Sequence, residues 1–214
     1  MKGILFDLDG TLIDSMRVWA NLDINFVRSK GHDFDFTYID ELKSKSVEEL
    51  PDFFKRVYGF DSTVKEIYDH MEKTMKGHYR TEFEYKEGVE NKIRALKDEG
   101  YRMCITTATI SDYCYEILER LRLDEYMDFV LTPDKAGIPK SDPGFFEKAL
   151  ERLETKREKT YVFDDALYAI KNAKDLGFKA VGVYDESSKD QVGEIKDLSD
   201  HFIYSFEDLD ISKL

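Results

Sequence analysis

The sequence predicts an α/β protein with a parallel sheet and a helical insertion after the first strand. Three observations predict this class. After position 88, short apolar runs alternate with helical stretches of about ten residues. Two acids follow directly after the first apolar run. A long stretch whose apolar residues are spaced as in helices then separates that run from the next one. Strands joined through helices form βαβ units, whose strands are parallel and whose crossovers are right-handed.

The first strand is predicted at residues 4–6, an unbroken apolar run of the kind that is buried on both faces of a sheet. Asp7 and Asp9 follow where this strand ends. Two like charges so close together are costly unless a cation or a reacting phosphoryl group makes use of them. Gly10 then allows the main chain to turn sharply and to approach a ligand closely. The strand end is therefore a candidate site.

The next stretch, residues 14–85, interrupts the alternation of strand and helix. Its apolar residues at helical spacing are Trp19, Leu22 and Phe26, then Val47, Leu50 and Phe54, then Val64, Ile67 and Met71. Because the stretch follows the first strand and returns before the next one, we expect a helical cap at the catalytic end of the sheet. The predicted domains are a catalytic core of residues 1–13 plus 86–214 and a cap of residues 14–85.

The rest of the chain supplies the remaining strands and helices of the core. The predicted elements are a helix at 88–99, a strand at 101–107, a helix at 111–121, a strand at 129–131, a helix at 143–153, a strand at 160–163, a helix at 166–176, and strands at 179–184 and 202–204. Glycines at 100 and 177 follow two of these helices, as is typical of helix ends.

Composition and charge restrict the possible functions. The 214 residues are 42% apolar and 14% aromatic, which is enough for a sizeable core. A formal net charge of −13 argues against binding to bare nucleic acid or to an anionic membrane surface. Cys104 and Cys114 show no disulfide or metal-binding pattern, and the first apolar run is too short for a signal peptide. We therefore expect a cytoplasmic protein with a small-molecule partner.

A threonine, a lysine and a second acidic pair follow the first pair in order along the chain. They are Thr107 (or Thr106, one position earlier), Lys140, and Asp164 with Asp165. Because ligands bind beyond the carboxyl ends of parallel strands, we expect these side chains beside the first acidic pair. The four ordered motifs resemble those of the haloacid dehalogenase-like hydrolase superfamily, in its helical-cap branch with a Rossmann-like core. The resemblance covers essentially the whole chain.

The resemblance implies a role for each acid of the first pair. Asp7 would be the nucleophile that becomes an aspartyl-phosphate. Asp9 would be the general acid/base, which protonates the leaving alcohol and then takes a proton from water. An acid at this second position favours phosphate chemistry over the cleavage of carbon–halogen bonds. The main-chain carbonyl of Leu8 is expected to be a metal ligand.

The other motifs would bind the phosphate and a Mg²⁺ ion. Thr107 would donate a hydrogen bond to a phosphate oxygen, and Lys140 would neutralise the nucleophile and the transferring phosphoryl group. Mg²⁺ prefers oxygen ligands in octahedral geometry. The resemblance implies that Asp165 binds it directly and Asp164 binds it directly or through water. The full set of acids expected at the metal is Asp7, Asp9, Asp164 and Asp165.

The predicted function is a Mg²⁺-dependent phosphatase that hydrolyses a small phosphorylated metabolite. A sugar-phosphate mutase similar to β-phosphoglucomutase is the first alternative, and a non-catalytic phosphate-binding protein of the same fold is the second. Trp19 stands where those mutases carry a histidine, which favours the phosphatase. A helical cap favours a small substrate, to which Lys43, Lys45 and Ser46 would add contacts. The particular ester and the oligomeric state are left open.

Overall fold

The computed structural model describes residues 1–43 and 45–214, with the side chains of all of these except Asp40 and Lys43. The chain forms two compact units. One unit comprises Met1–Met16 and Glu82–Leu214, and the other comprises Arg17–Thr81. In the part of the chain that the structure describes, the helices are too short or too polar to cross a bilayer.

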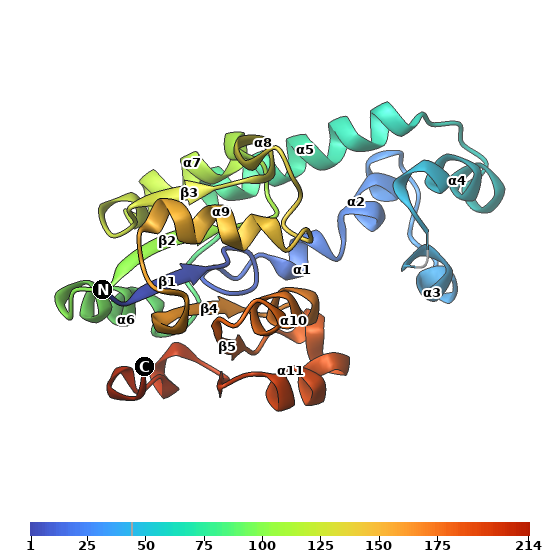
Figure 1. The fold of residues 1–214 in the computed structure, drawn as a ribbon. Helices are drawn as coiled ribbons and strands as arrows, with labels where there is room; N and C mark the ends of the chain where they lie inside the picture. The colour runs from blue at the N-terminus through green and yellow to red at the C-terminus, as the bar shows by residue number, and fades with distance from the viewer. Residues whose placement is uncertain (44) are drawn as a thin grey trace. The chain divides into compact units, whose positions relative to one another are not determined.

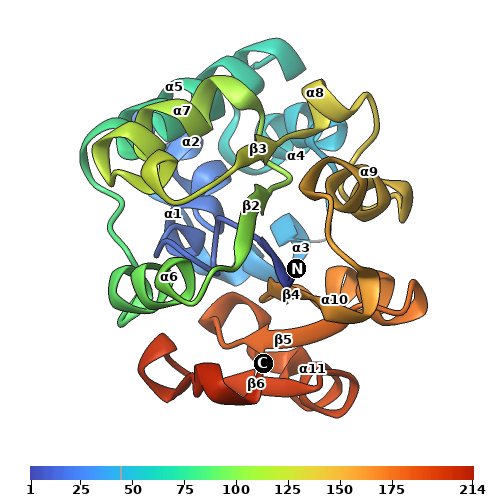
Figure 2. The same ribbon diagram turned by 60° about the vertical axis from the view of Figure 1, so that its left-hand side comes forward.

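The first unit is built on a six-stranded sheet with the order β3-β2-β1-β4-β5-β6 (Figure 1). The strands are β1 Gly3–Phe6, β2 Arg102–Thr106, β3 Phe129–Leu131, β4 Thr160–Asp164, β5 Lys179–Val183 and β6 His201–Ile203. Each neighbouring pair in this sheet is parallel. Figure 2 shows the strands in this order from top to bottom. The predicted α/β class and parallel sheet are thereby confirmed.

The register of the central strands decides where the polar residues emerge. Strand β1 is buried along its whole length and lies between β2 and β4. Its last residue, Phe6, is opposite Ile105 of β2 and Phe163 of β4. The chain positions that follow these three residues therefore come out at one edge of the sheet, as expected for the carboxyl ends of parallel strands.

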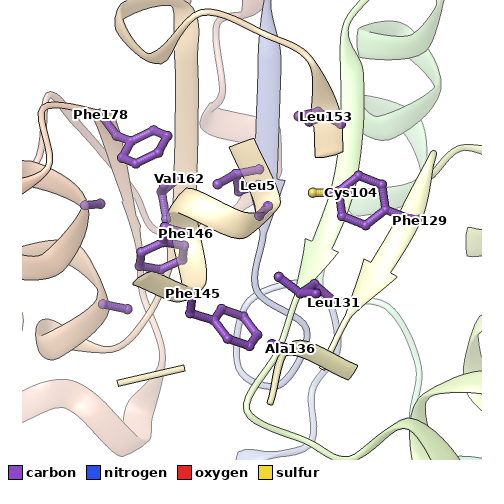
Figure 3. Close-up of a cluster of buried hydrophobic side chains, with 13 residues drawn as sticks. Leu5, Cys104, Phe129, Leu131, Ala136, Phe145, Phe146, Leu153, Val162 and Phe178 are labelled. Atoms are coloured by element: carbon purple, nitrogen blue, oxygen red, sulfur yellow. The ribbon is translucent and has the colours of Figure 1, made fainter. Parts of the chain in front are cut away.

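Helices cover both faces of the sheet. Those of the first unit are α6 Val89–Asp98, α7 Ser111–Arg120, α8 Pro133–Ala136, α9 Gly144–Leu153, α10 Leu167–Asp175 and α11 Val192–Leu198. Figure 3 shows Phe145 and Phe146 of α9 packed against the strand residues Leu5 and Val162. The residues next to these along each strand point to the other face of the sheet. There the ring of Phe163 stacks on Phe206, with ring centroids 6.0 Å apart.

The second unit is helical throughout its regular elements. They are α2 Leu22–Ser29, α3 Ile39–Lys43, α4 Leu50–Tyr58 and α5 Val64–Thr81, with single turns at Phe36–Tyr38 and Val47–Glu49, and α1 Met16–Trp19 leads into them. Its core is rich in aromatic rings: Phe54 lies 5.5 Å from Phe26 and 5.6 Å from Phe60, between ring centroids. Gly59 adopts a left-handed conformation with φ +76° and ends α4.

The structure describes the side chains of two of the three residues of the helical insertion that are predicted to contact substrate. The side chain of Lys43 lies outside the described residues. Lys45 lies 3.7 Å from the carboxylate of Glu41, and Ser46 forms a reciprocal capping box with Glu49. Both described residues thus have contacts within their own unit, so a contact with substrate stays a prediction.

The two connections between the units leave the first unit side by side. Ile13 and Tyr85 form an antiparallel bridge, and the amide of Asp14 donates to the carbonyl of Glu84 at 3.1 Å. The outgoing and returning segments are therefore joined by main-chain hydrogen bonds immediately after the loop that begins at Asp9.

Candidate active site

The sheet places the predicted motifs at one edge of the first unit. Asp7 directly follows β1, Thr107 directly follows β2, and Asp164 is the last residue of β4. All three are buried, with 5%, 1% and 1% of their surface exposed, respectively. The pleat and the parallel register, rather than any local motif, bring these distant positions together.

Lys140 reaches this edge from the turn between α8 and α9. Gly137 ends α8 in a left-handed conformation, and Asp142 then accepts the amide hydrogen of Gly144 at the start of α9. The ammonium of Lys140 lies 2.5 Å from Oδ1 of Asp7 and 2.7 Å from Oδ2 of Asp164. Its side chain is only 1% exposed. A buried ammonium therefore bridges the ends of β1 and β4.

Three buried acids, two of them paired with this lysine, lie together and fit a divalent cation. Oxygens of Asp7, Asp164 and Asp165 lie within 4.8 Å of one another. Oδ2 of Asp7 is buried without a hydrogen-bond partner, while Oδ1 of Asp164 accepts from the amide of Ala166 at 2.9 Å. The cluster holds more carboxylates than ammonium groups, and carboxylate oxygens are the ligands that hard cations prefer. The donor set and the unpartnered oxygen both match a bound metal ion.

The pKa values of the cluster reflect burial and crowding of charge. Burial raises the pKa of Asp7 to about 7, against the opposing effect of Lys140 and with the help of Asp164. Burial, followed by the charge of Asp7, raises the pKa of Asp165. Burial alone would lower the pKa of Lys140, but the carboxylates of Asp164 and Asp7 outweigh it and raise that pKa. Asp7 and Asp165 thus hold protons more tightly than in water when no cation is bound.

Asp9 has a separate environment from the three clustered acids. Its Oδ1 accepts from the hydroxyl of Ser15 and its Oδ2 from the hydroxyl of Thr109, both at 2.7 Å. Its carboxylate is not part of the cluster formed by the other three acids among the described residues. The structure therefore does not bring the Asp9 side chain into this cluster, and its two hydroxyl contacts fix it in one orientation. A metal-ligand role for Asp9 stays a prediction.

The carbonyl of Leu8, the predicted main-chain metal ligand, has hydrogen-bond partners within its own loop. This oxygen accepts the amide hydrogens of Leu12 and Ile13, at 2.9 and 3.0 Å. A carbonyl oxygen has two lone pairs, so both are used within the loop. A metal-ligand role for this carbonyl stays a prediction.

The two candidate threonines differ in what their hydroxyl groups do. Thr106 is the last residue of β2, and its hydroxyl donates to the carbonyl of Phe6 at 3.4 Å. Oγ1 of Thr107 instead accepts the amide hydrogen of Thr109 at 3.0 Å. The hydroxyl hydrogen of Thr107 is therefore not consumed by this contact. Of the two, Thr107 is better placed to donate to a phosphate oxygen.

Ser15 and Thr109 were missed by the sequence interpretation. Ser15 lies in the loop after β1, and Thr109 lies in a stretch rich in hydroxyl residues, 106–111, that begins with the last residue of β2. Such residues commonly occur in turns for local reasons, so their types alone do not indicate contact with an acid far away in the sequence. Thr109 is 100 positions from Asp9, and only the sheet brings the two loops together.

Fold and site together define a class of protein, an α/β enzyme whose buried acids fit a metal ion at the carboxyl edge of its sheet. The family model described as haloacid dehalogenase-like hydrolase matches residues 4–183. The chain belongs to this family, as its motifs predict.

Relatives and solved structures extend the likeness over nearly the whole chain. The pyrophosphatase PpaX of Halalkalibacterium halodurans is 29% identical over 212 residues, which are 96% of this chain and 94% of the relative. The glyceraldehyde 3-phosphate phosphatase of Pyrococcus furiosus is 30% identical over 197 residues, 85% of this chain and 80% of the relative. The crystal structure of a putative beta-phosphoglucomutase from Thermotoga maritima superposes with a TM-score of 0.82 at 21% identity, covering 100% of this chain and 99% of that one. The structural likeness supports the shared fold.

The raised pKa of Asp7 predicts a pH-dependent stability difference between the protein and its Asp7→Asn variant. The folded state binds the Asp7 proton up to about pH 7, whereas the unfolded chain releases it near the ordinary value of 3.8. The stability contributed by this proton is thus present at low pH and is lost as the pH rises to about 7. Because asparagine cannot ionise, the melting temperature of Asp7→Asn should rise relative to the unchanged protein between about pH 5 and pH 8, measured in EDTA.

Asp210→Asn is the matched control for this measurement. Asp210 is exposed, and hydrogen bonds from Ser212 lower its pKa, so it stays ionised across the same pH range. The difference in melting temperature between Asp210→Asn and the unchanged protein should therefore not vary with pH over this range. A difference for Asp7→Asn that is equally constant would contradict the assigned direction of the Asp7 pKa.

Proposed function

We propose that this chain is a Mg²⁺-dependent phosphatase that hydrolyses a small phosphorylated metabolite through an aspartyl-phosphate on Asp7. The observation that carries the proposal is the buried Asp7 carboxylate, held by Lys140 through one oxygen and without a hydrogen bond at the other. Two relatives support it, since one is named a pyrophosphatase and the other a glyceraldehyde 3-phosphate phosphatase. Both names describe hydrolysis of a phosphoryl bond.

The first chemical step is transfer of the phosphoryl group to Asp7. The carboxylate attacks phosphorus in line with the leaving oxygen, a P–O bond to Asp7 forms, and the bond to the leaving group breaks. Asp9 donates its proton to that departing oxygen, so that an alcohol leaves. Ser15 and Thr109 hold both oxygens of Asp9, which keeps this acid in one place before the substrate arrives.

The second step returns Asp7 to its starting state. Asp9, now ionised, takes a proton from a water molecule as the water oxygen attacks phosphorus. The bond between phosphorus and Asp7 breaks, and inorganic phosphate leaves. Asp9 is protonated again and ready for the next substrate, so protons and electrons balance over the cycle.

Lys140 and Thr107 bind the charge of the phosphoryl group. Lys140 offers a fixed ammonium beside the attacking carboxylate, which costs no reorganisation during the reaction. The Thr107 hydroxyl can donate its hydrogen to a phosphate oxygen while it still accepts from the amide of Thr109. When bound by Asp7, Asp164 and Asp165, a Mg²⁺ ion would supply further positive charge for the phosphate oxygens.

We infer that the helical unit acts as a cap that restricts the substrate to small esters. Its supporting observation is connectivity: the unit is inserted between β1 and β2, and its two connections leave beside the loop that carries Asp9. A change in these connections can therefore be passed to the general acid/base loop. Caps of this kind close over a small substrate and open for product release.

The nucleophile assignment predicts that Asp7→Asn loses hydrolysis of p-nitrophenyl phosphate by at least about 10³-fold, because an amide cannot form the phosphoenzyme. Asp9→Asn should lose about 10² to 10⁴-fold in kcat on this ester, because hydrolysis of the phosphoenzyme needs a general base even where the leaving group needs little help from an acid. Asp175→Asn, a change of an exposed acid on α10, is the control and should keep full activity. An Asp7→Asn protein that is folded and active within about tenfold of the unchanged protein would refute the assignment.

The metal assignment predicts that EDTA abolishes turnover and that Mg²⁺ restores it. Ca²⁺ should restore it poorly, because its longer and more numerous bonds suit in-line transfer less well. Mg²⁺ should also raise the melting temperature of the unchanged protein and raise that of Asp165→Asn less, since one ligand is missing. Undiminished turnover in a fully chelated sample would rule out the requirement.

The mutase alternative is favoured by one comparison, the fold shared with a putative beta-phosphoglucomutase. Trp19, in place of the histidine of those mutases, argues against it because an indole N–H can donate but cannot accept a proton. Supplied with β-glucose 1-phosphate and catalytic glucose 1,6-bisphosphate, the protein should therefore release inorganic phosphate. Formation of glucose 6-phosphate as the main product would decide for the mutase.

A further inference from the structure

The ammonium of Lys86 makes three contacts at the base of the helical insertion that the proposed chemistry does not use. It follows the Ile13–Tyr85 bridge and precedes α6, and its amide donates to the carbonyl of Leu12 at 2.9 Å. Its ammonium donates to the carbonyls of Gly10 and Tyr184, at 2.7 and 2.6 Å. The third contact is with Oδ2 of Asp185 at 3.0 Å. An ammonium has three hydrogens, so this one is fully used.

The Gly10 carbonyl lies in the loop that carries the general acid/base. Gly10 directly follows Asp9 and has φ +84°, a conformation that favours glycine. A Cβ atom at this position would lie 2.7 Å from Oδ2 of Asp165. The next residue, Thr11, donates its hydroxyl to Oδ1 of Asp165 at 3.4 Å. The loop is therefore in contact with a proposed metal-binding acid and is hydrogen-bonded to Lys86.

Asp185, the counter-ion of Lys86, is also held by hydrogen bonds to its neighbours in the chain. Asp185 follows β5 and is 7% exposed. Its Oδ1 accepts from both the amide and the hydroxyl of Ser187, at 2.9 and 2.7 Å, which leaves Oδ2 for Lys86. The carbonyl of Tyr184 belongs to the same strand end. Lys86 thus links the Gly10 carbonyl of the Asp9 loop to the Tyr184 carbonyl and the buried Asp185 carboxylate at the end of β5.

We propose that Lys86, with Asp185 as its counter-ion, is a positioning residue that fixes the Asp9–Gly10 loop and so places the general acid of the phosphatase. This inference rests on the proposed function. Without the ammonium, two carbonyls and a carboxylate lose their donor, and the loop has no other side chain from the β5 end to hold its Gly10 carbonyl among the described contacts. A displacement of a catalytic group by about 1 Å can cost about 10²-fold in rate.

A positioning role for the general acid has a kinetic signature that a purely structural role lacks. Hydrolysis of an alkyl phosphate needs protonation of a poor leaving group, whereas p-nitrophenolate leaves without much help. Because kcat/KM reports transfer to Asp7, it isolates the step in which Asp9 acts as an acid. Displacement of Asp9 should therefore reduce kcat/KM for the alkyl ester far more than for the aryl ester.

The test compares Lys86→Met with Lys92→Met, using glycerol 3-phosphate and p-nitrophenyl phosphate with Mg²⁺. Lys92 is the matched control, because it also donates to main-chain carbonyls, those of Leu209 and Glu207, away from the acids. Lys86→Met should lose about 10²-fold in kcat/KM on the alkyl ester and about tenfold or less on the aryl ester. Lys92→Met should show no such difference between the esters. Asp185→Asn, which keeps an acceptor, should show a smaller loss with the same preference.

Amide hydrogen exchange provides a readout that does not depend on activity. Exchange in a peptide covering residues 8–13 should be faster in Lys86→Met and Asp185→Asn than in Lys92→Met. Unchanged exchange there, or equal losses of kcat/KM on the two esters, would overturn the positioning role. If the unchanged protein hydrolyses neither ester, the proposed function fails, and the exchange measurement still decides whether Lys86 holds the loop.

Discussion

The ion pairs of Lys140 with Asp7 and Asp164 are the contacts on which the site depends. The order β2-β1-β4 places the ends of β1 and β4 next to each other, so the sheet itself brings two carboxylates into a buried position. Such carboxylates repel each other and lose hydration. An ammonium 2.5 and 2.7 Å away offsets both effects, and it has to be delivered by the turn before α9. The packing of α9 on the sheet therefore serves the site as well as the core.

The balance of charge in the cluster explains how one site can attract first a cation and then an anion. Three buried acids lie together with one buried lysine, which pairs with two of them, so the cluster alone is acidic. The proposed Mg²⁺ ion would compensate the excess carboxylate charge, and an anionic ester would then meet a site that no longer repels it. The strongly acidic surface of the whole protein, with net charge −13, need not oppose the substrate once the local field is reversed.

The sequence is sufficient to predict the sheet, the acids and the buried lysine. Apolar runs that end in acids mark strand ends, and parallel strands present their ends at one edge, so the meeting of Asp7 with Asp164 follows from pattern and topology. The predicted boundary at Thr107 is off by one residue, because β2 ends at Thr106. Helix and strand ends are decided by single hydrogen bonds, which apolar periodicity does not report.

The contacts made by loops are what the sequence could not supply. The direction of the Leu8 carbonyl depends on the Gly10 turn, and the hydroxyl partners of Asp9 come from two different loops. Lys86 and Asp185 are 99 positions apart, in segments whose polar composition is typical of any turn. Pairing at such a distance is set by the tertiary fold, and a single sequence contains no covariation that would reveal it.

The Ile13–Tyr85 bridge also has a consequence for the folding kinetics of the chain. Strand β1 has to find β2 across a very long stretch, since even Lys2 and Tyr101 at the strand starts are 99 positions apart. Closing a loop of that length costs chain entropy and slows folding. Once the helical unit has folded and its two ends are joined at the bridge, only the short segments Gly3–Ile13 and Tyr85–Arg102 remain to be closed. The insertion, although it lengthens the chain, then acts as a cross-link that makes the central strand pairing effectively local.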